Sequence, residues 1–267
     1  MSDVEITDLE EKKIMIRGIV GKFVIPNSGV MIRYFSTYAS SNKNDKGHYE
    51  LLQMLKPMRE LTDPSTIRDL RTLLQRDLSD YRVARELIPY LLNENKIIDN
   101  VAFFPAILCV LMPGEFLRKE DVKYPECNDK GLTLDYGNWV LNKFPDKSGK
   151  ATSLAVLNIY ESKTDLIVLD GQHRANAFRV ISKSFESTDP KNVIYHKFYE
   201  PISIPEDYDS NLPVTIIWFD KNESANIDLD KINIIPDTIT REIFIAVNQN
   251  AQKISRSRNI LLDDKAP

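Results

Sequence analysis

The feature that most constrains the fold of this chain is an apolar strand that passes directly into a helix through a short polar turn. The run Leu166–Leu169 is typical of a buried strand, and the segment Ala175–Ile181 is typical of a helix. Between them lies the turn Asp170–Arg174, with the sequence DGQHR. Gly171 permits a tight turn and the close approach of a ligand, and the backbone N–H groups that open a helix attract anions. The turn therefore predicts an anion site, with phosphate as the favoured anion.

Each polar side chain of this turn has an expected role in such a site. Arg174 carries a planar guanidinium that can clamp phosphate, and Gln172 can contact phosphate or position a water. His173 can relay a proton near neutral pH and, with Asp170, is a candidate catalytic base. Asp170 would cap the turn or hold a divalent metal ion. A plainer alternative remains open, in which Asp170 only caps the helix and Arg174 only pairs with Asp170.

The composition of the 267 residues is that of an ordinary soluble protein, with 42% hydrophobic and 28% charged residues. No apolar run reaches the length of a membrane span, and the first residues lack the features of a signal peptide. The two cysteines, Cys109 and Cys127, do not form the pattern of a disulfide framework or a zinc site, and Cys109 is expected to be a packed core thiol. We therefore expect a cytoplasmic protein with no membrane partner.

The net charge of −4 and the sequence pI of about 5.6 argue against a protein whose whole surface grips nucleic acid. Any DNA contact must come from a local patch or from another subunit. The best patch combines three cations with neighbouring hydroxyl and amide side chains, which can bind phosphate or a base edge. Its cations are Lys253, Arg256 and Arg258. The alternative is a capped helix followed by a basic surface turn.

Hydrophobic patterns place further elements along the chain. The helix that follows residue 66 is expected to break at Leu78–Asp80, where Ser79 or Asp80 can cap a second helix. Residues 113–150 are expected to contain an insertion or extended loop around residues 124–127, and residues 161–165 are expected to form a hairpin turn. His48 is expected to be a surface histidine. The expected strands are 30–34, 103–112, 154–160 and 212–220, with a strand or hairpin at 12–24, and the expected helices are 49–61 and 66–92.

Several segments resemble a known family when they are taken together. Residues Ile167–Phe178, IVLDGQHRANAF, resemble the signature of DGQHR-domain proteins, which include the DNA sulfur modification protein DndB. Upstream, Leu73–Leu92 resembles the arginine-rich helical element of that family, and Phe103–Met112 resembles the strand that follows it. Downstream, Arg241–Asp264 resembles the asparagine-rich element of the family. The order and spacing agree from about residue 70 to 264.

The turn is also similar to the ParB and sulfiredoxin superfamily, in which a glycine turn followed by His-Arg lies at a nucleotide-binding strand–helix junction. Sulfiredoxin has a catalytic cysteine before its His-Arg, and Gln172 stands in that place here, which excludes thiol chemistry at the turn. The resemblance implies an α+β fold with a ParB/sulfiredoxin-like mixed sheet and flanking helices. Residues 1–61 would be a β-rich N-terminal extension packed on a DGQHR domain at 62–267, and the natural domain would continue beyond residue 267.

What the resemblance implies about function is a nucleotide-binding, DNA-associated regulator. In the DndB group this means control of genes for phosphorothioate modification of DNA, a bacterial antiviral defence. The cofactor would be a nucleoside triphosphate, ATP or CTP, together with Mg²⁺. DNA, other DNA-modification or defence proteins, and further copies of the chain would be its partners. The wall of the nucleotide pocket would be completed by Gln75, Arg76, Asn248, Asn250, Gln252 and Lys253.

Two alternatives remain open. The first is a true enzyme, either a weak ATPase or a DNA-modification subunit, in which His173 or Asp170 acts as general base. The second is a protein-interaction module without catalysis. The sequence contains no Walker A loop and no recognisable helix-turn-helix.

Overall fold

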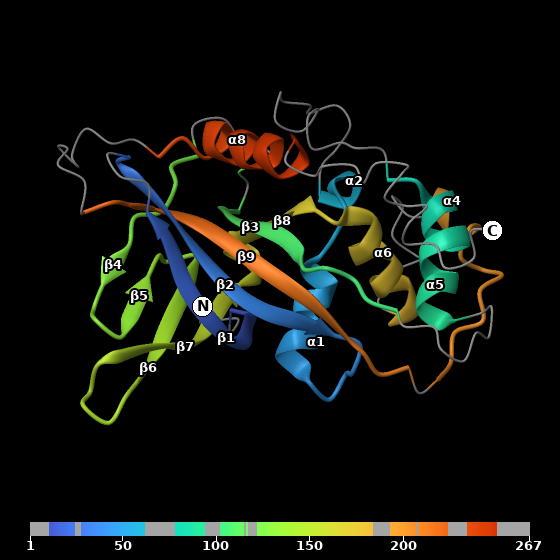
Figure 1. The fold of residues 1–267 in the computed structure, drawn as a ribbon, viewed down its shortest axis with the longest axis horizontal. Helices are drawn as coiled ribbons and strands as arrows, with labels where there is room; N and C mark the ends of the chain where they lie inside the picture. Colours follow the sequence, from blue (N-terminus) through green and yellow to red (C-terminus); the bar gives the residue numbers. More distant parts are fainter. Residues whose placement is uncertain are drawn as a thin grey trace, which may run out of the picture.

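The structure is a computed structural model, and it describes residues 11–24, 28–61, 78–93, 102–114, 116, 122–183, 193–206, 208–223 and 234–249. The strands of this part of the chain form one sheet of nine, in the order β4-β5-β6-β7-β1-β2-β9-β3-β8 (Figure 1). Neighbouring strands are antiparallel, except that β3 runs parallel to β9. The mixed sheet and the helices around it confirm the α+β class.

The elements have the following bounds. The strands are β1 (Lys13–Val24), β2 (Val30–Ser40), β3 (Ile107–Pro113), β4 (Asn128–Asp129), β5 (Thr133–Asp135), β6 (Trp139–Pro145), β7 (Ala151–Tyr160), β8 (Thr164–Asp170) and β9 (Asn211–Lys221). The α-helices are α1 (Lys46–Met54), α2 (Met58–Leu61), α4 (Asp80–Arg82), α5 (Ile88–Leu92), α6 (Gln172–Ile181), α7 (Val193–His196) and α8 (Pro236–Gln249). A π-helical turn, η2 (Val83–Leu87), joins α4 to α5, and a 3₁₀ turn, η3 (Glu161–Lys163), precedes β8.

The N-terminal strands lie in the middle of the sheet. In β1 the apolar residues alternate, and Ile14, Ile16 and Val20 are buried, as a strand with one face on the core requires. β1 pairs with β7 on one side and β2 on the other, and β2 pairs with β9. The predicted N-terminal extension therefore shares one sheet with the motif strand β8. The boundary predicted after residue 61 adjoins residues 62–77, which lie outside the described residues.

The extended loop predicted around residues 124–127 is confirmed, because residues 122–127 form neither helix nor strand. The strands that follow it, β4, β5 and β6, were not predicted. Gly131 and Gly137 have φ values of 79° and 76° and lie in the connections of this meander. Trp139 and Leu141 alternate with more exposed residues in β6 and are buried. The pattern is hard to recognise in the sequence because β4 and β5 are only two and three residues long.

The predicted hairpin at 161–165 is also wrong. β8 pairs with β3 at the end of the sheet, with Cys109 opposite Val168, whereas β7 pairs with β1 and β6. Five strand spacings separate β7 from β8 in the sheet order, which in a flat sheet would be about 24 Å. The three residues of η3 join the two strands, and such a link reaches at most about 14 Å. The sheet must therefore curl strongly, bringing β8 back towards β7.

The predicted helix 49–61 is divided in two. α1 ends at Met54, and Pro57 precedes α2, as expected for a residue that cannot donate a backbone hydrogen bond inside a helix. His48 was expected at the surface, and this is wrong. It is buried, its Nδ1 lies 2.7 Å from Asp45 Oδ1, and its ring stacks on Tyr38 with centroids 4.0 Å apart.

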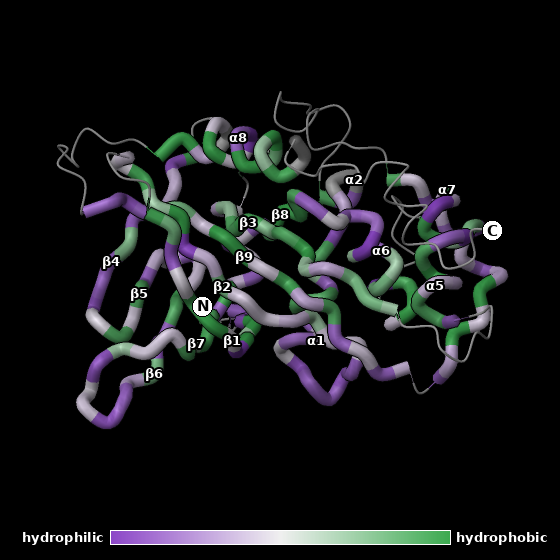
Figure 2. Tube along the Cα trace, viewed as in Figure 1, coloured by the Kyte–Doolittle hydropathy of each residue, from purple (hydrophilic) through white to green (hydrophobic). Residues whose placement is uncertain are grey.

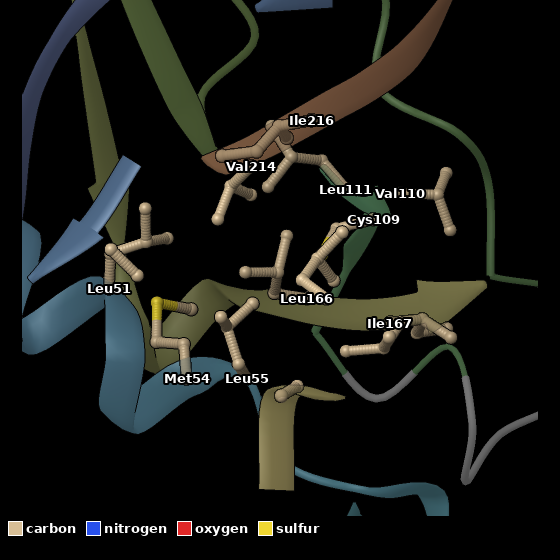
Figure 3. Packing of buried hydrophobic residues seen from close by; sticks show 14 of the residues in the cluster. Leu51, Met54, Leu55, Cys109, Val110, Leu111, Leu166, Ile167, Val214 and Ile216 are labelled. Atoms are coloured by element: carbon tan, nitrogen blue, oxygen red, sulfur yellow. The ribbon is translucent and has the colours of Figure 1, made fainter. Parts of the chain in front are cut away.

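The core lies between the sheet and the helices that cover it. Figure 1 shows α8 on one side of the sheet and α1 on the other. Leu51, Met54 and Leu55, from α1 and the residue after it, pack towards side chains of β3, β8 and β9 (Figure 3). Hydrophobic residues concentrate along β3 and β8, and hydrophilic ones at the tip of the β6–β7 hairpin (Figure 2). Cys109 is buried in this core, as predicted.

Among the helices in the described part of the chain, none is long and apolar enough to cross a membrane.

Candidate functional site

The DGQHR turn joins the end of β8 to the start of α6, as the sequence predicts. Gly171 occupies the N-cap position with φ 92° and ψ 22°, a left-handed conformation that favours glycine. A Cβ at this position would lie 2.6 Å from Ile107 Cδ1, so the Ile107 side chain would also have to move to admit it. Asp170 was a candidate helix cap; the cap is Gly171 instead, and no side chain accepts a hydrogen bond there. Among the described residues, no side chain caps the first turn of α6 in the way that Asp170 was expected to.

Arg174 binds back onto the turn that precedes it. Its Nη2 donates to Asp170 Oδ2 at 2.6 Å, and its Nη1 donates to the carbonyl oxygen of Pro105 at 2.6 Å. The Arg174 side chain is 17% exposed and that of Asp170 is 40% exposed. The pairing named as the plainer alternative is thus present. The second bond, to the Pro105 carbonyl, connects the turn to the segment that precedes β3.

His173 connects the start of α6 to the start of α4. The backbone N–H of Ser79 donates to His173 Nε2 at 3.0 Å, so this nitrogen is an acceptor and carries no proton. Ser79 is the N-cap of α4, and its hydroxyl accepts from the Arg82 N–H at 3.3 Å. The predicted helix start with a serine cap is confirmed, and the helix predicted before it lies in residues 66–77, outside the described residues. The contact places the start of α4 beside the DGQHR turn.

A cavity of about 240 Å³ opens over the turn. Its polar part consists of the residues 170–174 together with Arg82, and its apolar wall includes Leu87, Phe104 and Phe244. Pockets that enclose a whole drug-sized ligand measure about 300–1,000 Å³. The cavity therefore accommodates a phosphate group, and the remainder of a nucleotide would extend beyond it.

Buried polar side chains fix the orientation of α6 beneath this cavity. Arg179 makes two hydrogen bonds to Glu60 of α2, at 2.9 and 2.8 Å, and both side chains are 1% exposed. Asn176 donates to the Tyr199 hydroxyl at 2.8 Å, and Tyr199 donates to the carboxylate of Asp80. These contacts were not predicted from the sequence. Their signal was the presence of Asn176 and Arg179 among apolar residues of the motif helix.

The structure places only part of the predicted site. It brings together Asp170–Arg174 and adds Arg82, Phe104 and Phe244. Asn248 lies in α8, for which only the backbone is described at that position. The other predicted residues, Gln75, Arg76, Asn250, Gln252, Lys253, Arg256 and Arg258, lie outside the described residues.

A metal role was predicted for Asp170. The described residues contain no group of three or more histidine, cysteine, aspartate or glutamate side chains that could hold a metal ion. Asp170 therefore lies in no such cluster within the described ranges. Its Oδ2 is bound by Arg174.

Comparisons of the chain with protein-family models, with curated protein sequences and with solved structures found no match.

Proposed function

We propose that this protein is a nucleotide-binding, DNA-associated regulator of the kind that the DGQHR resemblance implies. The phosphate groups of a nucleoside triphosphate bind in the cavity at the start of α6. The observation that carries this proposal is the opening of a glycine-capped helix N-terminus into a cavity lined by Arg82 and Arg174. Such a terminus supplies N–H donors and the positive end of the helix dipole to an anion.

Arg82 is the cation best able to change partners in this cavity. It pairs with Glu86 through Nε at 3.2 Å, and both side chains are more than half exposed. Exposed pairs of this kind contribute little, about 0–1 kcal/mol. An incoming phosphate can therefore replace Glu86 at small cost. Arg174 keeps its bonds to Asp170 and Pro105 and adds positive charge to the cavity.

The cavity offers Mg²⁺ one carboxylate ligand among the described residues, that of Asp170. This ion is commonly held by one or two carboxylates together with substrate phosphates and waters. The half-exposed carboxylate of Asp170 supplies one such group at the edge of the cavity. When bound, the ion would neutralise phosphate charge, and Asp170 would position it through a coordinated water.

The nucleotide part of the proposal is tested by equilibrium binding of labelled ATP, CTP and GTP, with and without Mg²⁺. Arg82→Gln removes a cation that lines the cavity, and a charged hydrogen bond of about 1.5–3 kcal/mol corresponds to a loss of affinity of about 10- to 100-fold. Arg85→Gln is the matched control, because Arg85 is exposed on the same helical segment and does not line the cavity. Equal affinities for the two variants would reject the site.

The DNA part of the proposal rests on the resemblance and on the predicted patch of Lys253, Arg256 and Arg258. Each phosphate contact removed should reduce the slope of log K against log salt by about 0.9. Alanine at all three positions should therefore weaken binding to a DNA duplex and flatten its salt dependence together. Fluorescence anisotropy at several salt concentrations, with and without nucleotide, measures both. An unchanged slope would remove the patch from the proposal.

The contacts of His173 favour binding over turnover. A general base needs a lone pair to accept a proton, and the Nε2 lone pair of His173 receives the Ser79 N–H. We therefore do not extend the proposal to NTP hydrolysis. In the proposed regulator His173 is a positioning residue that holds α4, and with it Arg82, at the cavity.

A further inference from the structure

A second cavity, of about 340 Å³, lies at the end of the sheet opposite α6, where β9 ends (Figure 1). Four cationic side chains from four strands line it: Lys22 of β1, Arg33 of β2, Lys143 of β6 and Lys221 of β9. We call it the cationic pocket. Its cations are separated by up to 199 positions in the sequence, so only the folded sheet brings them together.

Arg33 is held rigidly in this pocket. Its Nε donates to Asp220 Oδ2 at 2.6 Å, and the Tyr136 hydroxyl donates to the same oxygen at 3.0 Å. The side chains of Arg33 and Asp220 are only 12% and 10% exposed. Among the described residues, the ion pair with Asp220 through Nε is the one partner shown for the Arg33 guanidinium. Its two Nη groups are therefore presented as a fork to a ligand in the pocket.

Lys143 adds a half-buried amine to the same space. Burial is the main cause that lowers the pKa of Lys143, and the charge of Arg33 is the next. Lys22 acts in the same direction, whereas Asp129 and Cys127 oppose it. Within the described ranges neither Lys143 nor Lys22 is in an ion pair. The fold thus places the Lys143 and Lys22 amines near the paired Arg33 guanidinium, and an anion that contacted these groups would offset the repulsion between them.

Four carboxylates also line the pocket, and two of them, Asp220 and Glu126, are already paired with cations. Asp220 is engaged by Arg33 and Tyr136, and Glu126 pairs with Lys221 at 2.8 Å. Asp129 and Glu223 are exposed, so water screens their charge more strongly than that of the half-buried Arg33 and Lys143.

From this geometry we propose that the cationic pocket binds the phosphate group of a small phosphorylated metabolite. A phosphate monoester carries close to two negative charges at neutral pH, which matches the Arg33 fork together with the Lys143 and Lys22 amines. The volume of about 340 Å³ lies within the range of small-ligand pockets. The site is separate from the cavity at α6 and does not depend on nucleotide binding there.

The test is chemical protection of Lys143. The protein is acetylated with trace acetic anhydride at neutral pH, with glycerol phosphate, with inorganic phosphate, or with sodium chloride at matched ionic strength. Mass spectrometry of the peptides then gives the labelling rate at each lysine. Both phosphate compounds should slow labelling of Lys143 saturably and several-fold. Lys150, exposed beyond the end of β6 on the same hairpin, is the matched control and should label at an unchanged rate.

A variant must then remove the protection without leaving a buried charge unpaired. Arg33→Gln combined with Asp220→Asn removes both members of the pair at once, so the fold is retained and the guanidinium fork is lost. We expect phosphate protection of Lys143 to disappear in this double variant and to persist in Arg82→Gln, which alters only the α6 cavity. Equal protection of Lys143 and Lys150, equal protection by sodium chloride, or full protection in the double variant would each overturn the proposal.

Discussion

At the scale of single residues, Arg174 lies in the predicted turn, but its side chain has different partners from the predicted one. The guanidinium was expected to face a phosphate, yet it holds Asp170 and the Pro105 carbonyl. Because these bonds shape the turn, replacing Arg174 changes the structure of the cavity as well as its charge. Arg82, which is exposed and weakly paired, is therefore the better probe of ligand binding.

Arg174→Ala should lower the free energy of unfolding by about 1.5–3 kcal/mol, because it removes hydrogen bonds made by a charged group. Urea denaturation of the purified variant measures this loss. Arg85→Ala, an exposed arginine in η2, is the control and should change stability by no more than about 0.5 kcal/mol. An Arg174 variant as stable as the Arg85 control would show that the turn does not depend on these bonds.

The two cysteines should be slow to alkylate. Burial raises the pKa of Cys109, and burial is also the main cause that raises the pKa of Cys127. A raised pKa keeps the thiol protonated, so the reactive thiolate forms only above the ordinary value of about 8.5. Labelling with iodoacetamide across a pH series should be slower than for glutathione at every pH below that value. Cys109, which is fully buried, should be slower than Cys127. Fast labelling of either at neutral pH would contradict this.

At the scale of elements, α6 is fixed by polar contacts as well as by apolar packing. Arg179 of α6 bonds to Glu60 of α2. Asn176 of α6 bonds to Tyr199, which in turn bonds to Asp80 of α4. Breaking a buried ion pair on one side costs much more than replacing both members, because a single buried charge is left without its partner. The cavity at the start of α6 therefore depends on residues that do not line it.

Glu60→Gln should accordingly destabilise the protein by about 3–5 kcal/mol. The double variant Glu60→Gln with Arg179→Met should recover a substantial part of that loss, since the guanidinium that faced Glu60 is then absent. Thermal and urea unfolding of both variants provide the comparison. Equal stability of the single and double variants would mean that the pair does not fix α6 as described.

The success of sequence-based prediction also differs between elements. β1, β9 and the β8–α6 turn are predictable because long apolar patterns and a glycine define them. β4 and β5 are too short to carry a pattern. The adjacency of β7 and β8 in the sequence suggested a hairpin, whereas their separation in the sheet depends on other strands, of which β1 and β2 are more than a hundred residues away in the sequence. The cationic pocket and the buried contacts of α6 were likewise beyond prediction, because their members meet only through this topology.

At the scale of the whole molecule, the curled sheet leaves little space between its strands and α1. Gly47, in the first turn of α1, lies against β1, and a Cβ there would be 1.9 Å from the Met15 carbonyl oxygen. The obstacle is backbone, so no flexible side chain can move aside. The position of α1 on the sheet therefore requires glycine at this point.

Gly47→Ala should lower stability by about 2–4 kcal/mol, because α1 must move away from β1 to admit the methyl group. Gly149→Ala is the matched control: its φ of 82° strains an alanine, but a Cβ there meets nothing within 4 Å. Its expected loss is about 1–2 kcal/mol. Urea denaturation of both variants compares them. A smaller loss for Gly47→Ala than for Gly149→Ala would contradict the close packing of α1.

The central claim is that nucleotide phosphate binds at the start of α6. The most direct measurement is the shift of assigned backbone amide resonances while ATP with Mg²⁺ is added to the ¹⁵N-labelled protein. We predict saturable shifts for Gly171, Gln172 and His173, with a dissociation constant that rises about 10- to 100-fold in Arg82→Gln and is unchanged in Arg85→Gln. Saturable shifts that leave these three amides unmoved, or no saturable shifts with any nucleoside triphosphate, would contradict the claim.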